Sequence, residues 1–125
     1  MKGSYFDDPF PYRRVAAVVV KSAVDDLQAD WPVGKGKECH RVAKAREWRQ
    51  NRVSAAQWLS SRAAAPFLDA FGLDHHVCLE RVRWAEVVLD ILREHQEGVF
   101  PLTPRVVRHL ENGLRIIDRE EEWAA

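Results

Sequence analysis

The sequence contains few cysteines and no excess of either charge. Cys39 and Cys78 are the only cysteines among 125 residues, which excludes the disulfide framework that holds many small secreted domains together. Lysine plus arginine equals aspartate plus glutamate, 19 of each, so a strongly basic surface over the whole chain is excluded as well. We therefore expect a cytoplasmic protein with reduced cysteines.

Long apolar runs and repeated segments are also missing. The first residues, Met1 to Asp8, lack the apolar core of a signal peptide, and no apolar stretch is long enough to span a bilayer. No internal repeat occurs at the spacing of solenoid proteins. With 46% apolar residues, the chain has enough apolar side chains for a core. A single domain over residues 1–125 without membrane contact is the prediction.

The motifs of common active sites do not occur. Gly34 and Gly36 precede lysines, but no Gly-Lys-Ser/Thr follows a strand, so a phosphate-binding loop is excluded. No Gly-x-Ser-x-Gly elbow is present, and neighbouring carboxylates such as Asp25 and Asp26 diverge on a helix. We predict that the protein is not an enzyme and uses no cofactor.

Two clusters of cysteine and histidine are the candidates for a metal site: Cys39 with His40, and His75 with His76 and Cys78. Zinc requires four converging ligands, typically in pairs two to four residues apart. His75 and Cys78 fit that spacing, but two adjacent ligands such as Cys39 and His40 seldom reach one ion. We predict no metal, a core position for Cys78, and exposed histidines near a helix start.

The apolar pattern predicts an all-α fold, a compact bundle of about five helices that follows an irregular arm over residues 1–12. The first helix is expected from Arg13 to about Asp30, with a buried face at Ala16, Val20, Ala23 and Leu27. A loop follows over residues 31–37, and a second helix is expected over 38–51. Ser54, with Gln57 in the capping-box position, predicts a new helix start. Pro66 and Gly72 then bound a short aromatic helix.

The carboxyl-terminal residues predict an antiparallel helical hairpin, although the same two helices could equally form a homodimer interface. A long helix is expected from His75, capped by Asp74, to about Glu97, where Gly98 stops it; its buried stripe is Val82, Ala85, Leu89 and Leu92, widened by Val88 and Ile91. Thr103 and Pro104 start the last helix, whose stripe is Val107, Leu110, Leu114 and Ile117. Acidic residues at its carboxyl end oppose the helix dipole, so residues 119–125 are predicted to form a frayed tail.

Charge is distributed unevenly along the chain. Eight basic and two acidic residues lie between residues 35 and 62, against seven basic and twelve acidic from residue 63 onward. Aromatic rings among arginines suit base stacking and phosphate contact, although arginine stems covering a buried indole give the same pattern. We predict a nucleic-acid-binding surface on the central helix, formed by Lys35, Lys37, Arg41, Lys44, Arg46, Trp48, Arg49 and Arg52.

Two further interpretations remain open. The acidic carboxyl end predicts a protein-binding surface, formed by Arg119, Glu120, Glu121 and Trp123, for a host or phage partner. Residues 67–73 with the helix from His75 are similar to a helix-turn-helix, with Cys78 in an inward position. Arg81 falls on the next inward position, which is unfavourable, so the segment 35–62 is the better nucleic-acid surface.

One stretch resembles a known group of proteins. Its residues are Ala56-Gln57-Trp58-Leu59-Ser60-Ser61, Phe67, Gly72-Leu73-Asp74, Val77, Arg81 and Val82. Together they resemble a pattern in small phage and prophage proteins of unknown function, over roughly residues 15–83. The cysteine frequent near the aromatic helix of those proteins is replaced here by Ala70 or Phe71, and the basic segment 35–52 is longer. The resemblance implies a phage-type regulatory or accessory role and supplies no catalytic residues.

Overall fold

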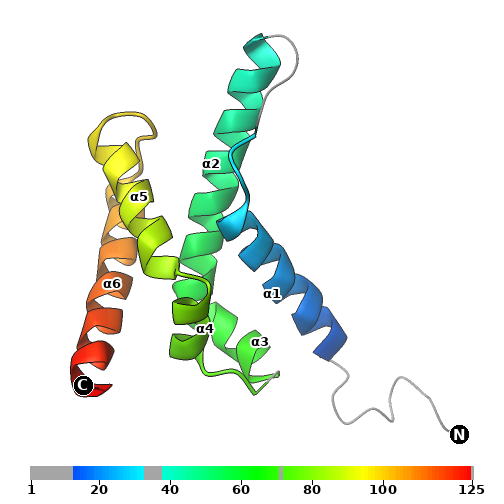
Figure 1. Cartoon of the computed structure of the whole chain (residues 1–125), viewed down its shortest axis with the longest axis vertical. Coiled ribbons are helices and arrows are strands. Elements are labelled where there is room, and N and C mark those ends of the chain that lie inside the picture. The colour runs from blue at the N-terminus through cyan, green and yellow to red at the C-terminus, as the bar shows by residue number, and fades with distance from the viewer. Residues whose placement is uncertain (1–12, 33–37, 71, 125) are drawn as a thin grey trace, which may run out of the picture.

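All regular secondary structure in the described part of the chain is helical, which confirms the predicted fold class. The computed structural model describes residues 13–32, 38–70 and 72–124, and their side chains except those at 38, 39 and 118–124. The helices are α1 (Arg13–Gln28), α2 (Glu38–Ser60), α3 (Ala65–Asp69), α4 (His75–Arg81), α5 (Trp84–Gln96) and α6 (Pro104–Ala124), with a 3-10 turn, η2 (Arg62–Ala64), before α3. Figure 1 shows α2 rising well above the other helices at its amino-terminal end.

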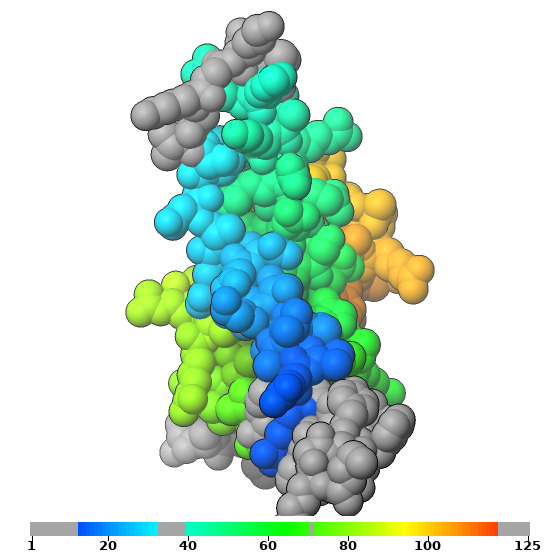
Figure 2. Space-filling view, turned by 90° about the vertical axis from the view of Figure 1, so that its right-hand side faces the viewer, coloured from blue at the N-terminus to red at the C-terminus, as the bar shows by residue number. Residues whose placement is uncertain are grey.

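The helix α1 follows its predicted face. Ala16 and Leu27 are buried, and Ala23 packs against the main core as a partly buried residue. Figure 2 shows α1 lying across one side of the molecule, with the amino-terminal turns of α2 rising above it. The predicted boundary near Asp30 is correct to within two residues, since α1 ends at Gln28.

The predicted helix start at Ser54 is wrong, because α2 is a single helix of 23 residues from Glu38 to Ser60. No glycine or proline occurs within this range, so nothing in the backbone chemistry ends the helix before Ser54. Ser54 is exposed in the middle of the helix, and its hydroxyl accepts a weak hydrogen bond of 3.5 Å from the Gln50 amide. A good capping residue is therefore not sufficient evidence of a cap.

The turn from α3 into α4 is built as the sequence predicts. Pro66 lies in the first turn of α3, and Gly72 ends this segment with a φ of 67°, in the left-handed region that glycine favours. The Asp74 carboxylate then accepts a hydrogen bond of 3.2 Å from the backbone N–H of Val77, which is an N-cap contact.

The predicted long helix from His75 to Glu97 is wrong, because the helix is interrupted after Arg81. Arg83 has a φ of 55°, which is unusual for a residue with a side chain, and α5 begins again at Trp84. Val88 and Ile91, which widen the predicted stripe, are buried as expected, and Trp84 is buried with them. Leu89, predicted to be buried, is instead 58% exposed.

The indole of Trp84 gives a physical reason for that break. It is fully buried, and its Nε1–H donates a hydrogen bond of 2.8 Å to the carbonyl of Ala56 on α2. A Cβ atom built on Gly113 of α6 would lie 2.5 Å from the Trp84 ring, so glycine permits this close approach. Burying the large ring between α2 and α6 offsets the cost of the left-handed residue at 83.

The helix α6 lies beside α5 and also contacts α2 (Figure 1). Gly98, with a φ of 77°, ends the segment after α5, and Thr103 Oγ1 accepts a hydrogen bond of 3.4 Å from the Val106 N–H at the start of α6. Leu110 is fully buried, and Leu114 and Ile117 pack against the core. The helix continues to Ala124, beyond the Asp118 after which fraying is expected.

The main core surrounds the carboxyl-terminal half of α2. Val53, Ala55, Ala56 and Leu59 from α2 meet Leu27, Val82, Trp84, Val88, Ile91 and Leu110 from the other helices. A second, smaller cluster joins Ala64, Leu68 and Cys78, and Trp58 packs against both. Among the described side chains in the amino-terminal half of α2, residues 40–49, none belongs to either cluster.

Candidate nucleic-acid interface

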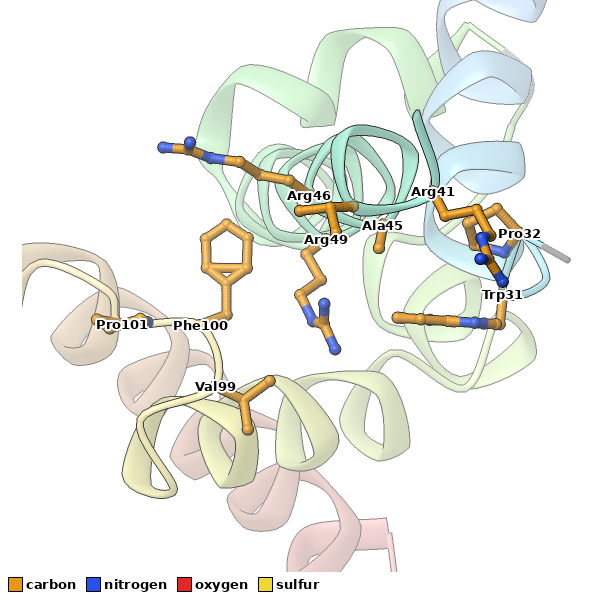
Figure 3. A pocket seen from close by; sticks show the side chains of 10 residues that line it. Trp31, Pro32, Arg41, Ala45, Arg46, Arg49, Val99, Phe100 and Pro101 are labelled. Carbon is orange, nitrogen blue, oxygen red and sulfur yellow. The ribbon is translucent and has the colours of Figure 1, made fainter. Parts of the chain in front are cut away.

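The exposed half of α2 borders a broad groove of about 1040 Å³, which we call the α2 groove (Figure 3). Three segments line it: Trp31–Pro32 after α1, residues between Arg41 and Arg49 on α2, and Val99–Pro101 between α5 and α6. Figure 3 shows Arg41 beside Trp31 on one side of the groove, and Val99 and Phe100 on the other. Segments far apart in the sequence thus meet at this surface.

The α2 groove combines apolar surface with positive charge. Trp31 is 48% exposed, Val42 63% and Val99 50%, so water contacts a large part of each apolar side chain. Arg41 and Arg46 are exposed, and neither forms an ion pair within the described part of the chain. Among the described residues that line the groove, none is an aspartate or a glutamate. Such a surface suits a ligand that is both anionic and flat or apolar.

Arg49 and Arg52, by contrast, are held by carboxylates of α5. Arg49 Nε lies 2.6 Å from Glu94 Oε2, and Arg52 lies 2.7 Å from Asp90 Oδ2 and 3.5 Å from Glu94 Oε1. The side chains of Arg52 and Glu94 are only 10% and 12% exposed. Charge-assisted hydrogen bonds at this degree of burial join α2 to α5 and leave Arg52 unavailable to a phosphate.

Trp48 is likewise part of the packing. Its Nε1–H donates a hydrogen bond of 2.8 Å to the carbonyl of Ala29, and its ring centre lies 4.9 Å from that of Trp31 at an interplanar angle of 78°. The Arg52 guanidinium lies 4.6 Å from the centre of the Trp48 ring, a cation–π distance. These contacts fasten the connection after α1 to the middle of α2.

Asp90 is the carboxylate whose protonation is most affected by this arrangement. Hydrogen bonds from Arg93 and then from Arg52 hold the pKa of Asp90 below its ordinary value, outweighing the opposing effect of burial. The Asp90 carboxylate, and with it the Arg52–Asp90 ion pair, therefore persists to a lower pH than an ordinary aspartate would allow.

The predicted nucleic-acid-binding residues thus divide into four groups. Arg41 and Arg46 are exposed and line the α2 groove, whereas Lys44 is exposed elsewhere on α2. Trp48, Arg49 and Arg52 join α2 to its neighbours, although Arg49 also lines the groove; the Arg52 guanidinium lies over the Trp48 ring, and both arginines pair with carboxylates of α5. Lys35 and Lys37 lie outside the described residues.

The sequence did not reveal Trp31, Val99 and Phe100 as companions of the central basic helix. Trp31 falls in the expected loop over residues 31–37, and no sequence pattern indicates that it meets Val99 and Phe100. The local signal that could have indicated a surface role is a tryptophan within a loop, since loops usually lie at the surface.

Of the second predicted surface, the structure describes the backbone alone. Arg119, Glu120, Glu121 and Trp123 belong to α6, which is helical to Ala124, but their side chains lie outside the described part. The acidic segment is thus carried on the carboxyl-terminal turns of α6, beyond Ile117, which packs against the core.

Cys78 occupies a core position, as predicted, and is 6% exposed. Burial raises the pKa of the Cys78 thiol, and the nearby charge of Arg81 only partly opposes this effect. His75 is partly buried and hydrogen-bonds through Nε2 to the Leu59 carbonyl, which corrects the prediction that it is exposed. Among the described residues, no group of three or more potential ligands is placed to hold a metal ion.

Ser60 and His109 form a contact that the sequence did not suggest. His109 Nε2 lies 3.2 Å from Ser60 Oγ and 3.3 Å from the Gln57 carbonyl oxygen. A carbonyl only accepts, so the ring nitrogen must carry the proton and donate to it, and it cannot then take a proton from Ser60. Ser60 Oγ also lies 3.1 Å from the Ala56 carbonyl oxygen, to which its hydroxyl donates. The contact joins α2 to α6.

The helix-turn-helix interpretation receives little support from the geometry. The first helix, α3, has five residues and the second, α4, has seven, so neither offers a long face to a groove of DNA. Cys78 is buried as that interpretation requires, but Arg81, expected on an inward position, is exposed and Val82 is buried instead.

Comparisons with protein-family profiles, with curated protein sequences and with solved structures find no match to this chain. Of the helices that the structure describes, none combines the length and the apolar character needed to cross a membrane.

Proposed function

We propose that the protein binds nucleic acid through the α2 groove. The observation that carries the proposal is the placement of Arg41 and Arg46 in a groove that contains the half-exposed indole of Trp31 and, among its described residues, no carboxylate. Guanidinium groups contact phosphates with planar, paired donors, and an exposed indole offers a surface for a base.

The balanced charge of the chain is compatible with this proposal. The arginines of the groove lie at the amino-terminal end of α2, whereas the acidic segment lies at the carboxyl-terminal end of α6, at the opposite end of the molecule (Figure 1). At physiological salt, charges farther apart than about 8 Å are largely screened from one another. A phosphate near Arg41 therefore experiences the local positive charge.

The role that fits such binding is regulatory or accessory. In keeping with the resemblance of residues 15–83 to small phage proteins, we propose a phage-type protein that contacts nucleic acid without catalysing a reaction. The Ser60–His109 contact gives no support for an enzyme, because Nε2 is already committed as a donor to the Gln57 carbonyl.

The test is the salt dependence of oligonucleotide binding by the double variant Arg41→Ala/Arg46→Ala. We expect weaker binding and a plot of log affinity against log salt whose slope is shallower by about 0.7 to 0.9 for each phosphate that the variant no longer neutralises. The matched control is Arg105→Ala/Arg115→Ala, which removes two exposed arginines from α6 and should leave the slope unchanged. Equal slopes for all three proteins would contradict the proposal.

A second candidate function is protein binding through the acidic end of α6. The specific observation in its favour is that α6 stays helical to Ala124 and so carries Glu120, Glu121 and Trp123 on one continuous helix beyond Ile117, which packs against the core. Truncation after Asp118 should leave folding and oligonucleotide binding unchanged and abolish capture of a host or phage protein partner, whereas unchanged capture would contradict this candidate.

A further inference from the structure

We propose that the ligand of the α2 groove is single-stranded nucleic acid, with an unpaired base stacked on the indole of Trp31. This inference rests on the proposed function and makes it narrower. The evidence comes from the two walls of the groove and from the fixed geometry of Trp31.

The indole of Trp31 is both exposed and held in place. Trp31 as a residue remains 48% exposed, although the centre of the Trp48 ring lies 4.9 Å from the centre of its ring and the Arg49 guanidinium 4.8 Å from it. Trp48 and Arg49 are themselves fixed, by the Ala29 carbonyl and by Glu94. An aromatic ring with an open surface and a fixed orientation can stack on a base with little loss of conformational entropy.

The opposite wall is also anchored. The Leu102 N–H donates a hydrogen bond of 2.8 Å to His95 Nδ1, and the Val99 N–H donates one of 2.9 Å to the Glu94 carbonyl. These bonds fix the segment that presents Val99 and Phe100 to the groove (Figure 3). The groove thus offers apolar surface on both sides, which suits a base better than a free phosphate.

Arg41 and Arg46 suit the sugar–phosphate backbone of a strand that crosses the α2 groove. Arg41 and Arg46 are five residues apart, which corresponds to roughly 7.5 Å along the helix axis. Figure 3 shows Arg41 beside Trp31, and Arg46 on the side of Phe100. A strand that crosses the groove from Arg41 toward Arg46 would place its backbone near both guanidinium groups and direct a base toward the Trp31 ring beside Arg41.

A duplex cannot use this surface in the same way. Its bases are stacked on one another, and it presents only phosphates and base edges to a protein. Single strands, in contrast, offer open base faces, and stacking on an aromatic side chain typically strengthens binding about ten- to hundredfold per base. The exposed indole therefore distinguishes a single strand from a duplex, whereas Arg41 and Arg46 alone would not.

The experiment compares an oligothymidylate with a DNA duplex of equal length, using the full chain and the variants Trp31→Ala and Trp31→Phe. We expect the wild type to prefer the single strand, and Trp31→Ala to lose about ten- to hundredfold of that affinity with little change toward the duplex. Trp31→Phe, which keeps a stacking ring, should retain most of it. The single strand should also quench tryptophan fluorescence of the wild type more than that of Trp31→Phe.

Each result supports or overturns the inference. Equal affinity of the wild type for both ligands, or an equal loss of both in Trp31→Ala, would overturn the stacking inference and leave the proposed function standing. Absence of binding to either ligand at low salt would overturn both. If Trp31→Ala fails to fold, the fluorescence comparison decides, because Trp31→Phe preserves the ring contact with Trp48 and equal quenching would overturn the inference.

Discussion

The arginines in the two halves of α2 differ in their surroundings. In the carboxyl-terminal half, Val53, Ala56 and Leu59 form the centre of the core, and Arg52 at its edge is paired with carboxylates of α5. In the amino-terminal half, Arg41 and Arg46 are exposed and line the α2 groove. One helix thus carries both the folding core and the proposed binding surface.

The two halves show that an arginine near a tryptophan in a sequence does not by itself predict either packing or an open surface. Arg52 and Trp48 are in contact because both are packed, whereas Arg41 and Trp31 border an open groove. The difference lies in partners that are distant in sequence. Asp90 and Glu94 pair with Arg52, and Glu94 also pairs with Arg49. No carboxylate of the described residues pairs with Arg41 or Arg46. Variants matched between the two halves should therefore differ in stability.

The largest loss of stability is expected from Trp84→Ala, which removes the largest fully buried side chain and its hydrogen bond to α2. We expect a loss of about 3 to 5 kcal/mol in the free energy of unfolding, measured by urea denaturation. Trp31→Phe, in the half-exposed groove, should change it by less than about 0.5 kcal/mol. Similar losses in both variants would remove the distinction between core and groove.

Arg52→Ala should have the next largest effect, because it leaves Asp90 and the buried Glu94 without a shared partner. We expect a loss of about 2 to 3 kcal/mol in unfolding free energy. The matched variant Arg46→Ala removes an arginine from the same helix and should change stability by less than about 0.5 kcal/mol. A stable Arg52→Ala protein would place Arg52 among the binding residues again.

Gly113→Ala tests the packing of the core directly, because helix propensity and packing predict opposite changes in the free energy of unfolding. In an exposed helix this substitution stabilises by about 1 kcal/mol. Here the added Cβ would lie 2.5 Å from the Trp84 ring, so we expect a loss of about 1 to 3 kcal/mol from overpacking. Asn112→Ala, at the exposed neighbouring position, is the control. A stabilised Gly113→Ala protein would show that α6 does not approach Trp84 so closely.

The smallest effect concerns acid stability. Hydrogen bonds from Arg93 and Arg52 make the pKa of Asp90 lower in the folded state than in the unfolded state. The ionised carboxylate therefore contributes its full stabilisation above the unfolded-state pKa, and this stabilisation is lost as the pH falls through the folded-state pKa. Asp90→Asn should remove the stabilisation by the ionised carboxylate. The free energy of unfolding should then decline less steeply as the pH falls below the ordinary aspartate pKa. An unchanged acid profile would show that Asp90 does not hold α5 against α2.

The ends of several helices could be predicted from the sequence. Gly72, Asp74, Gly98 and Thr103 act at these ends as their chemistry indicates, because capping depends on a few neighbouring residues. The continuity of α2 at Ser54 agrees with the absence of glycine and proline from Glu38–Ser60, a local signal. The break at Arg83 could not be predicted locally, because it depends on the burial of Trp84 against α2 and α6.

The candidate site could be predicted only in part. The concentration of arginines on the central helix indicated the helix that borders the α2 groove, and Arg41 and Arg46 line that groove. The roles of Arg49 and Arg52 depend on Glu94 and Asp90, about forty residues away in the chain, and no local pattern specifies that pairing. The contribution of Val99–Pro101 is likewise a product of the folded arrangement.

The most direct test of the division within α2 is amide hydrogen exchange along this helix, with and without a single-stranded oligonucleotide. We expect protection close to that of global unfolding for residues 52–60, weaker protection for residues 40–48, and an increase confined to the weaker half when the oligonucleotide is present. Uniform protection along α2 that the oligonucleotide leaves unchanged would contradict the separation of a folding half from a binding half.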